Sequence, residues 1–209
     1  MKFDEYAKTW DTEAMIERSK NIAEKIKSCI EYKEDLTAME FGCATGLISF
    51  NLSEVFKEIV LIDSSAEMIN VVKEKIAYYD NKNIEALCLD LTKNDYLDKK
   101  FDVIYTSMAL HHVKDIKKLI NMFYELLNKD GKLCIIDLDK EDGSFHENGK
   151  EFDGHNGFEH SNIVKVLAEN KFMDIEIETF CNIKKIMNAN NLDKKPTYSL
   201  FCAVGKKVD

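Results

Sequence analysis

Residues 38–46 read AMEFGCATG, a short apolar run that ends in an acidic residue and an aromatic residue and then breaks into small residues. The run passes through Gly42, Ala44 and Gly46 into the helix-like stretch LISFNLSEVF. This order predicts a tight turn between a strand and a helix. Since glycine lets the backbone of such a turn approach a bound molecule closely, the stretch predicts a ligand-binding loop.

Strands and helices alternate along the chain around this loop. Apolar residues at helical spacing predict a helix over 13–31, and compact apolar runs predict strands. The order is typical of an α/β fold with a seven-stranded, mostly parallel sheet, helices on both faces and a C-terminal antiparallel strand pair. Beyond the strand that begins at residue 38, the predicted strands are 58–64, 83–91, 101–110, 131–139, 173–180 and 197–206, and later helices are predicted over 68–79, 116–127 and 161–170.

Four residues are predicted to set helix ends. Ser64 and Glu67 have the spacing of a capping box for the helix that follows strand 58–64. Asp115 is the predicted N-cap of the next helix, and Gly131 is its predicted stop.

Composition narrows the class of protein. The chain has 209 residues, which favours a single domain over 1–209. Apolar runs fall short of the roughly 20 residues that a membrane span requires, and the N-terminus lacks an apolar signal core, so we expect a cytoplasmic protein without a membrane partner. The six cysteines are widely spaced and are predicted to be reduced. A net charge of -9 disfavours nucleic acid as a partner.

The carboxyl ends of the strands are where an open α/β sheet binds ligands. Asp63 ends a predicted strand about twenty residues after Gly42, the distance at which an acidic side chain accepts hydrogen bonds from ribose hydroxyls. The loop lacks the GxGxxG pattern that binds a pyrophosphate, and Leu47 stands where a P-loop has lysine. Glu40 would repel a phosphate and suits a positively charged ligand. A nucleoside without phosphates is therefore predicted.

The strings EFGCATG, VLID, ALCLDL and FDVIYTSMALHHV together resemble the cofactor-binding motifs of class I S-adenosylmethionine-dependent methyltransferases. The resemblance covers residues 36–140 and implies a Rossmann-like sheet, S-adenosylmethionine as cofactor and S-adenosylhomocysteine as product. One residue departs from the family pattern, since Ala44 replaces the middle glycine of GxGxG.

The resemblance also implies roles for individual residues. The methionine part of the cofactor would be wrapped by the loop, the ribose held by Asp63, and the adenine met by the end of the third strand. The implied cofactor contacts are Glu40 near the ammonium group, Gly42, Cys43, Ala44 and Gly46 in the loop, Asp63 at the ribose, Ser64 and Met68 beside the adenosine, Asp90 and Leu91 at the adenine, and Ser107 and Trp10 at the edge of the site.

All five histidines follow the fourth or fifth predicted strand, on the cofactor side of the sheet. His111 and His112 are candidate acid or base catalysts, and the alternative is that they cap or pack a helix. A second alternative combines His146, His155 and His160 with Asp139, Glu141 and Asp153 as metal ligands. Their spacings match no zinc pattern, so no metal is predicted.

The resemblance implies that the N-terminal segment, residues 1–31, folds over the cofactor with Trp10 as a lid residue. Packing of Trp10 against the sheet is the alternative. The predicted layout continues with a cofactor-binding core over 36–140, a loop over 141–160 and a closing helix and strand pair over 161–209.

The predicted function is methyl transfer from S-adenosylmethionine to a small molecule by in-line displacement, for which the enzyme mainly holds the acceptor near the methyl carbon. Two alternatives remain at this point. One is a nicotinamide-dependent oxidoreductase on a similar sheet, which the missing GxGxxG disfavours. The other is a noncatalytic module that retains the cofactor fold.

Overall fold

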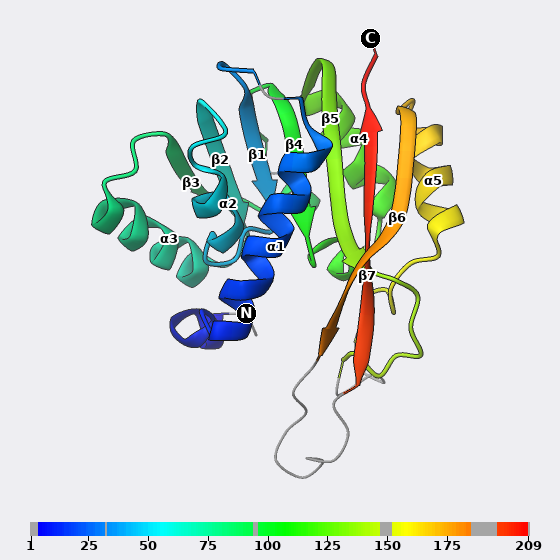
Figure 1. The fold of residues 1–209 in the computed structure, drawn as a ribbon, viewed down its shortest axis with the longest axis horizontal. Coiled ribbons are helices and arrows are strands. Elements are labelled where there is room, and N and C mark those ends of the chain that lie inside the picture. Colours follow the sequence, from blue (N-terminus) through cyan, green and yellow to red (C-terminus); the bar gives the residue numbers. More distant parts are fainter. Residues whose placement is uncertain (1–3, 32, 94–95, 147–151, 185–195, 209) are drawn as a thin grey trace.

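One sheet organises the protein (Figure 1). The computed structural model describes residues 4–31, 33–93, 96–146, 152–184 and 196–208. Within these residues seven strands lie in the order β3-β2-β1-β4-β5-β7-β6. The first five pair in parallel, and β7 pairs antiparallel with both β5 and β6. The strands are β1 (Thr37–Phe41), β2 (Glu58–Asp63), β3 (Ile84–Cys88), β4 (Phe101–Ser107), β5 (Leu127–Leu138), β6 (Met173–Lys184) and β7 (Thr197–Lys206).

Helices cover both faces of this sheet, because neighbouring strand residues point to opposite sides. Ala38 belongs to the apolar core under α1 (Glu13–Cys29), α2 (Leu47–Leu52) and α3 (Ala66–Tyr79). Met39 belongs to the core under α4 (Ile116–Leu126) and α5 (His160–Glu169). The predicted α/β fold, with its mostly parallel sheet and C-terminal antiparallel pair, is confirmed. No helix among the described residues is long and apolar enough to cross a membrane.

Three short 3-10 helices lie at the ends of the sheet where ligands are expected. They are η1 (Asp4–Thr9), η2 (Leu91–Lys93) after β3, and η3 (Leu110–His112) after β4. Strands β3 and β4 are therefore shorter than predicted. Asp90 starts the turn of η2 by accepting the backbone N–H of Thr92 (3.0 Å), and Met108 bends the chain after β4 with a φ of +54°.

The N-cap of α3 is Ser65, so the predicted capping box beginning at Ser64 is wrong by one residue. The hydroxyl of Ser65 accepts the N–H of Met68 (3.2 Å). The cap lies one residue after Ser64 because Oδ1 of Asp63 accepts the N–H of Ser65 (2.9 Å) and keeps the chain in a turn.

The predicted stop of α4 at Gly131 is also wrong. The predicted N-cap Asp115 is confirmed, since its side chain accepts the N–H of Lys118 (2.9 Å). The helix ends at Leu126 because Leu127 is extended and already pairs with Phe101 of β4. The chain then turns at Asp130, whose φ is +62°.

Other boundaries also differ from prediction, among them those of β2 (Glu58–Asp63), β5 (Leu127–Leu138) and α3 (Ala66–Tyr79). Helix α1 ends at Cys29, α2 has only one and a half turns, and α5 lies one residue earlier than predicted. Strand β6 extends to Lys184 because it pairs with β7 along its whole length. The predicted bounds of β7 are confirmed.

Candidate active site

The loop after β1 is built from backbone conformations that favour glycine. Gly42 and Gly46 have φ values of +70° and +79°. The N–H groups of Gly42 and Cys43 both bond to the carbonyl of Ile62 (2.8 and 3.1 Å), which ties the loop to the end of β2. A Cβ added to Gly42 would lie 2.4 Å from the Cβ of Ala109, so only glycine fits beside the segment that follows β4.

Asp63 fixes the middle of the loop from the end of β2. Its Oδ2 accepts the N–H of Ala44 (2.9 Å), the residue that replaces the family's middle glycine. Ala44 has a φ of +47°, a conformation that costs an L-residue roughly 1–2 kcal/mol. Burial raises the pKa of Asp63, and the backbone N–H groups of Ser65 and Ala44 oppose that rise. The backbone N–H of Ser64 also bonds to this carboxylate, and a carboxylate has about four acceptor sites, so acceptor capacity remains for a ligand hydroxyl.

Glu40 lies beneath the loop rather than on its surface, with 2% of its area exposed. Its carboxyl accepts a short hydrogen bond from the hydroxyl of Ser49 in α2, and that hydroxyl also lies 2.6 Å from the phenol oxygen of Tyr105. Burial raises the pKa of Glu40 to about 8, against the opposing hydrogen bond from Ser49. Without a ligand, Glu40 therefore carries a proton at neutral pH.

The predicted adenosine contacts lie along the ends of β2 and β3. The N–H of Leu89 bonds to the carbonyl of Asp63 (3.0 Å), which brings Asp90 beside the loop. Burial alone would raise the pKa of Asp90, but hydrogen bonds from Thr92 and Lys93 outweigh it and the pKa falls. Met68 and Leu91 are both buried. A hollow of about 380 Å³ opens beside Leu91 and is lined by Leu91, Thr92, Lys93, His112, Val113, Lys114, Asp115, Lys118, Leu119 and Met122.

The N-terminal segment contacts the loop directly. Asp11, the neighbour of Trp10, accepts a hydrogen bond from the hydroxyl of Thr45 (2.5 Å) and pairs with Lys75 of α3 (2.5 Å). Asp4 accepts a hydrogen bond from Ser65 (2.5 Å), so η1 lies against the start of α3. These contacts place Trp10 at the border of the loop, where its contact with the cofactor stays a prediction.

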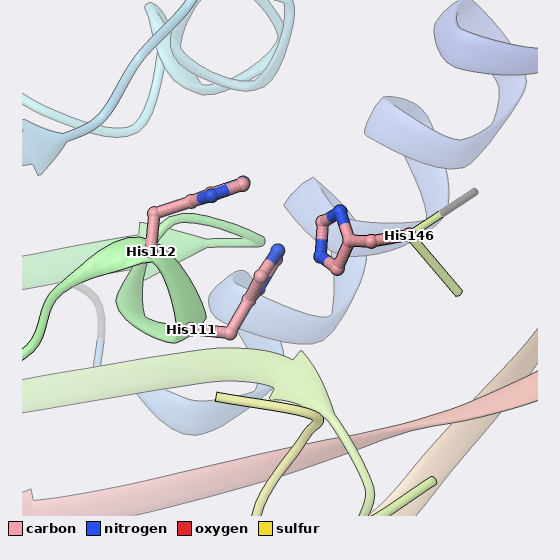
Figure 2. A group of neighbouring side chains, drawn as sticks. All are labelled: His111, His112 and His146. Atoms are coloured by element: carbon pink, nitrogen blue, oxygen red, sulfur yellow. The ribbon is translucent and has the colours of Figure 1, made fainter. Parts of the chain in front are cut away.

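Two histidines follow β4, and a third approaches them from the loop after β5. Figure 2 shows the rings of His111, His112 and His146 gathered around one space. The ring centroids of His111 and His112 are 4.2 Å apart, and each lies 5.3 Å from the ring of His146. One ligand-capable atom from each residue lies within 4.8 Å of the other two.

His111 is held by a buried carboxylate. The side chain of Asp137 at the end of β5 is fully buried, and its Oδ1 lies 2.5 Å from Nδ1 of His111. A carboxylate accepts hydrogen bonds, so the Nδ1–H of His111 is directed at Asp137 and Nε2 lies on the far side of the ring. The same carboxylate accepts the N–H of His111 (3.2 Å) and of Leu138 (2.7 Å). Ring and backbone of His111 are thus fixed together.

His155 and His160 each make a hydrogen bond outside this cluster. Nε2 of His160 lies 2.7 Å from Asp139, and Nε2 of His155 lies 3.0 Å from the carbonyl of Val113. His160 therefore meets Asp139 of the alternative metal set, but among the described residues neither of them joins His146 in a group of potential metal ligands. Partial burial lowers the pKa of His112 to about 3, helped by the neighbouring His111 and His146, so this ring is neutral at pH 7.

Several residues of the site escape prediction from sequence. Thr45 and Asp11 meet although 34 residues separate them, and Ser49 and Tyr105 meet beneath the loop. Asp137 lies within the predicted strand 131–139, but its partner His111 is visible only in the fold.

The residues present fit a phosphate-free nucleoside that ends in an amino acid. Gly42 and Gly46 leave backbone accessible, Asp63 offers acceptor oxygens, and the loop lacks a cation that would hold a phosphate. A family model described as a methyltransferase domain matches residues 15–187. This chain belongs to that family. The resemblance to class I S-adenosylmethionine-dependent methyltransferases is confirmed, and S-adenosylmethionine is the cofactor that membership assigns to the site.

Two curated relatives of this chain are also named as methyltransferases. The chain is 36% identical over 126 residues to an uncharacterized methyltransferase of Schizosaccharomyces pombe, covering 56% of this chain and 43% of that protein. It is 31% identical over 135 residues to malonyl-[acyl-carrier protein] O-methyltransferase 1 of Ilyobacter polytropus, covering 63% and 48%. The chain thus spans less than half the length of these curated relatives.

A solved structure shares the fold of the methyltransferase domain. Phosphoethanolamine N-methyltransferase 2 of Haemonchus contortus, in complex with S-adenosyl-L-methionine, superposes with a TM-score of 0.72 at 17% identity. The match covers 90% of this chain and 52% of that one. At this identity the likeness concerns the fold alone.

Proposed function

We propose that this chain transfers the methyl group of S-adenosylmethionine to a small-molecule acceptor. The observation that carries the proposal is the Asp63 carboxylate, which is bonded to the glycine loop at the end of β2, where a ribose hydroxyl is expected to bind. Bound there, the cofactor supplies a methyl group on a positively charged sulfur. The protein would hold the acceptor in line with that methyl carbon, which converts a bimolecular step into an intramolecular one.

The proposed cofactor contacts follow the strand ends. Gly42, Cys43, Ala44 and Gly46 would receive the amino-acid end, and Asp63 the ribose. The adenine would lie toward Asp90 and Leu91, with Ser64, Met68, Ser107 and Trp10 around the nucleoside. Glu40 acts from beneath the loop, and its proton would leave when the cationic cofactor binds, because a nearby positive charge favours the carboxylate form.

The acceptor side would be formed by the segment after β4, since Gly42 of the loop touches Ala109. An acceptor that must lose a proton requires a base, and His111, oriented by Asp137, is better suited than His112. The low pKa of His112 makes that ring a weak proton acceptor. The name of the Ilyobacter polytropus relative specifies an O-methyl transfer, which supports methyl transfer without fixing the acceptor atom of this chain.

The net charge of -9 favours a small acceptor, because a negatively charged chain repels polyanionic partners such as nucleic acid. A cytoplasmic location and a single-domain organisation are also proposed. All six cysteines are free in the structure, which is typical of a reducing compartment.

Thermal shift tests the proposal. The protein is heated alone and with S-adenosylmethionine, S-adenosylhomocysteine or NAD. We expect both sulfur nucleosides to stabilise the fold, by about 2.7 kcal/mol at 100 times the dissociation constant. Stabilisation by NAD alone would instead support the oxidoreductase alternative. Binding of S-adenosylhomocysteine without methyl transfer to any acceptor would support a noncatalytic module.

Asp63→Ala is expected to weaken S-adenosylhomocysteine binding by about 1.5–3 kcal/mol, because it removes hydrogen bonds between a carboxylate and the ribose. That is a loss of roughly 10- to 150-fold in affinity, measured by titration calorimetry.

Asp102→Ala is the matched control for that change. Asp102 is also a strand carboxylate with backbone and side-chain partners, since it accepts from the N–H and hydroxyl of Thr37 (both 2.9 Å) and from Asn128 (2.8 Å). It lies at the start of β4, at the opposite end of the sheet. Equal affinity losses in both variants would show that Asp63 acts through stability and not through the ribose.

A further inference from the structure

We propose that His111, His112 and His146 together bind one divalent transition-metal ion of the zinc type, and that this ion activates an oxygen or sulfur acceptor. The inference rests on the proposed methyl transfer for its chemical purpose, but the metal site itself is testable without it. It replaces the expectation that the chain binds no metal.

Ligand number and type are the first support. Three imidazole nitrogens gather within 4.8 Å of one another, two from η3 and one from the loop after β5 (Figure 2). Three protein ligands plus one open position are the composition of a catalytic zinc site, with zinc–nitrogen bonds of about 2.0–2.1 Å. Tetrahedral ligands at that bond length lie about 3.4 Å apart, so the nitrogens need to close by no more than about 1.4 Å.

Orientation of His111 is the second and independent support. A histidine that binds a metal with one ring nitrogen donates the other N–H to a carboxylate in most metal sites, which fixes the ring. Asp137 does this for His111, with its side chain fully buried and 2.5 Å from Nδ1. The nitrogen on the far side of the ring is Nε2, which is the atom a metal would bind.

The position of His146 is also fixed, although this residue is 34 positions beyond His112. One oxygen of Glu141 accepts the N–H groups of Gly143 (2.8 Å) and Phe145 (3.0 Å), which closes the chain into a turn just before His146. Ser144 bonds to the hydroxyl of Tyr198 on β7 (2.9 Å). The ring of His146 stacks on Phe152 with centroids 3.6 Å apart. The third ligand is therefore held toward the other two.

The location gives the ion a role in the reaction. The segment that carries His111 and His112 begins at Ala109, against Gly42 of the cofactor loop. A hydroxyl or thiol bound at the open position would lose its proton to solvent at neutral pH, because the ion stabilises the anion. The new bond from oxygen or sulfur to the methyl carbon forms as the carbon–sulfonium bond breaks. The electron pair of the broken carbon–sulfur bond stays on the sulfur. The sulfonium thereby becomes the uncharged thioether of S-adenosylhomocysteine.

Zinc binding tests the proposal directly. Tag-free protein is stripped with a chelator and titrated with zinc chloride by calorimetry, and cobalt(II) is used in parallel for its visible absorption. We expect one ion per chain for the wild type. His146→Ala is expected to weaken zinc binding by more than 100-fold, since loss of a ligand exceeds the roughly 10- to 100-fold cost of losing an outer partner. Asp137→Asn is expected to fall within that 10- to 100-fold range.

His160→Ala is the matched control, because His160 is also a histidine near a strand end but bonds to Asp139 instead of the cluster. It should keep the wild-type zinc affinity. The proposal is overturned if the wild type binds no zinc, or if His146→Ala binds it as tightly as the wild type; either result returns His111 to the role of a simple base.

Titration with S-adenosylhomocysteine in the same stripped samples separates the two proposals. Nucleoside binding without zinc binding removes only the metal site. Zinc binding without nucleoside binding removes only the proposed function. Retained nucleoside binding by His146→Ala also shows that this variant is folded.

Discussion

Asp137→Ala is expected to lower the free energy of unfolding by several kcal/mol, at roughly 1–3 kcal/mol for each buried donor that loses its acceptor. The change leaves three donors buried without an acceptor: Nδ1 and the backbone N–H of His111, and the N–H of Leu138. His111 is only 1% exposed, so water cannot replace the carboxylate without opening the segment after β4. Urea unfolding at pH 7 measures the loss.

Asp139→Ala is the control for that measurement. Asp139 follows the same strand and also contacts a histidine, but its side chain is 17% exposed and its partners His160 and Thr179 lie near the surface. A smaller loss is expected there. If the two variants lose equal stability, or if Asp137→Ala loses less than about 1 kcal/mol, the buried pair does not hold the site.

Glu40→Gln is expected to remove a pH dependence of stability. The pKa of Glu40 is about 8 in the folded protein and 4.5 as its ordinary value, because the carboxyl is buried. Below pH 4.5 both states carry the proton and the full contribution to stability is present. Between pH 4.5 and 8 the unfolded chain has lost its proton while the folded protein keeps it, so stability falls as pH rises.

The size of that effect is large. The rise in pKa corresponds to at most about 5 kcal/mol of stability lost between the two pKa values, at 1.36 kcal/mol per unit. Glutamine keeps a polar group beside Ser49 but does not ionise. We therefore expect the stability of Glu40→Gln, measured relative to the wild type, to rise between pH 4.5 and pH 8.5. Only the wild type loses stability over that range, so the profile of the variant is flatter.

Chemical denaturation at a series of pH values measures both profiles. Glu85→Gln, at an exposed position of β3, controls for the loss of one carboxylate. A Glu40→Gln profile that parallels the wild type would show that Glu40 is ionised in the folded protein. That result would favour a direct ion pair between Glu40 and the cofactor's ammonium group over a protonated Glu40 buried beneath the loop.

The parts of the fold that sequence predicts are those set by local pattern. The run before Gly42 and the apolar strands that end in Asp63 and Asp137 predict a parallel sheet with carboxylates at one edge, and the structure has that sheet. Element ends are less well predicted because tertiary contacts override local signals. Asp63 moves the N-cap of α3 to Ser65, and pairing with Phe101 draws Leu127 out of α4.

The histidine cluster lies beyond the reach of sequence pattern for a different reason. His111 and His112 are adjacent, but His146 joins them only through the turn closed by Glu141 and the contact of Ser144 with Tyr198. No fixed spacing encodes such an approach. The same holds for Asp11 and Thr45, which join the N-terminal segment to the cofactor loop across the fold.

A crystal structure of the complex with S-adenosylhomocysteine tests the central claim most directly. We expect both ribose hydroxyls within hydrogen-bond distance of Asp63, the amino-acid end over Gly42 and Gly46, and the sulfur facing the side of the site that carries His111. A nucleoside bound elsewhere, or bound at this loop with its ribose away from Asp63, would contradict the assignment of this site.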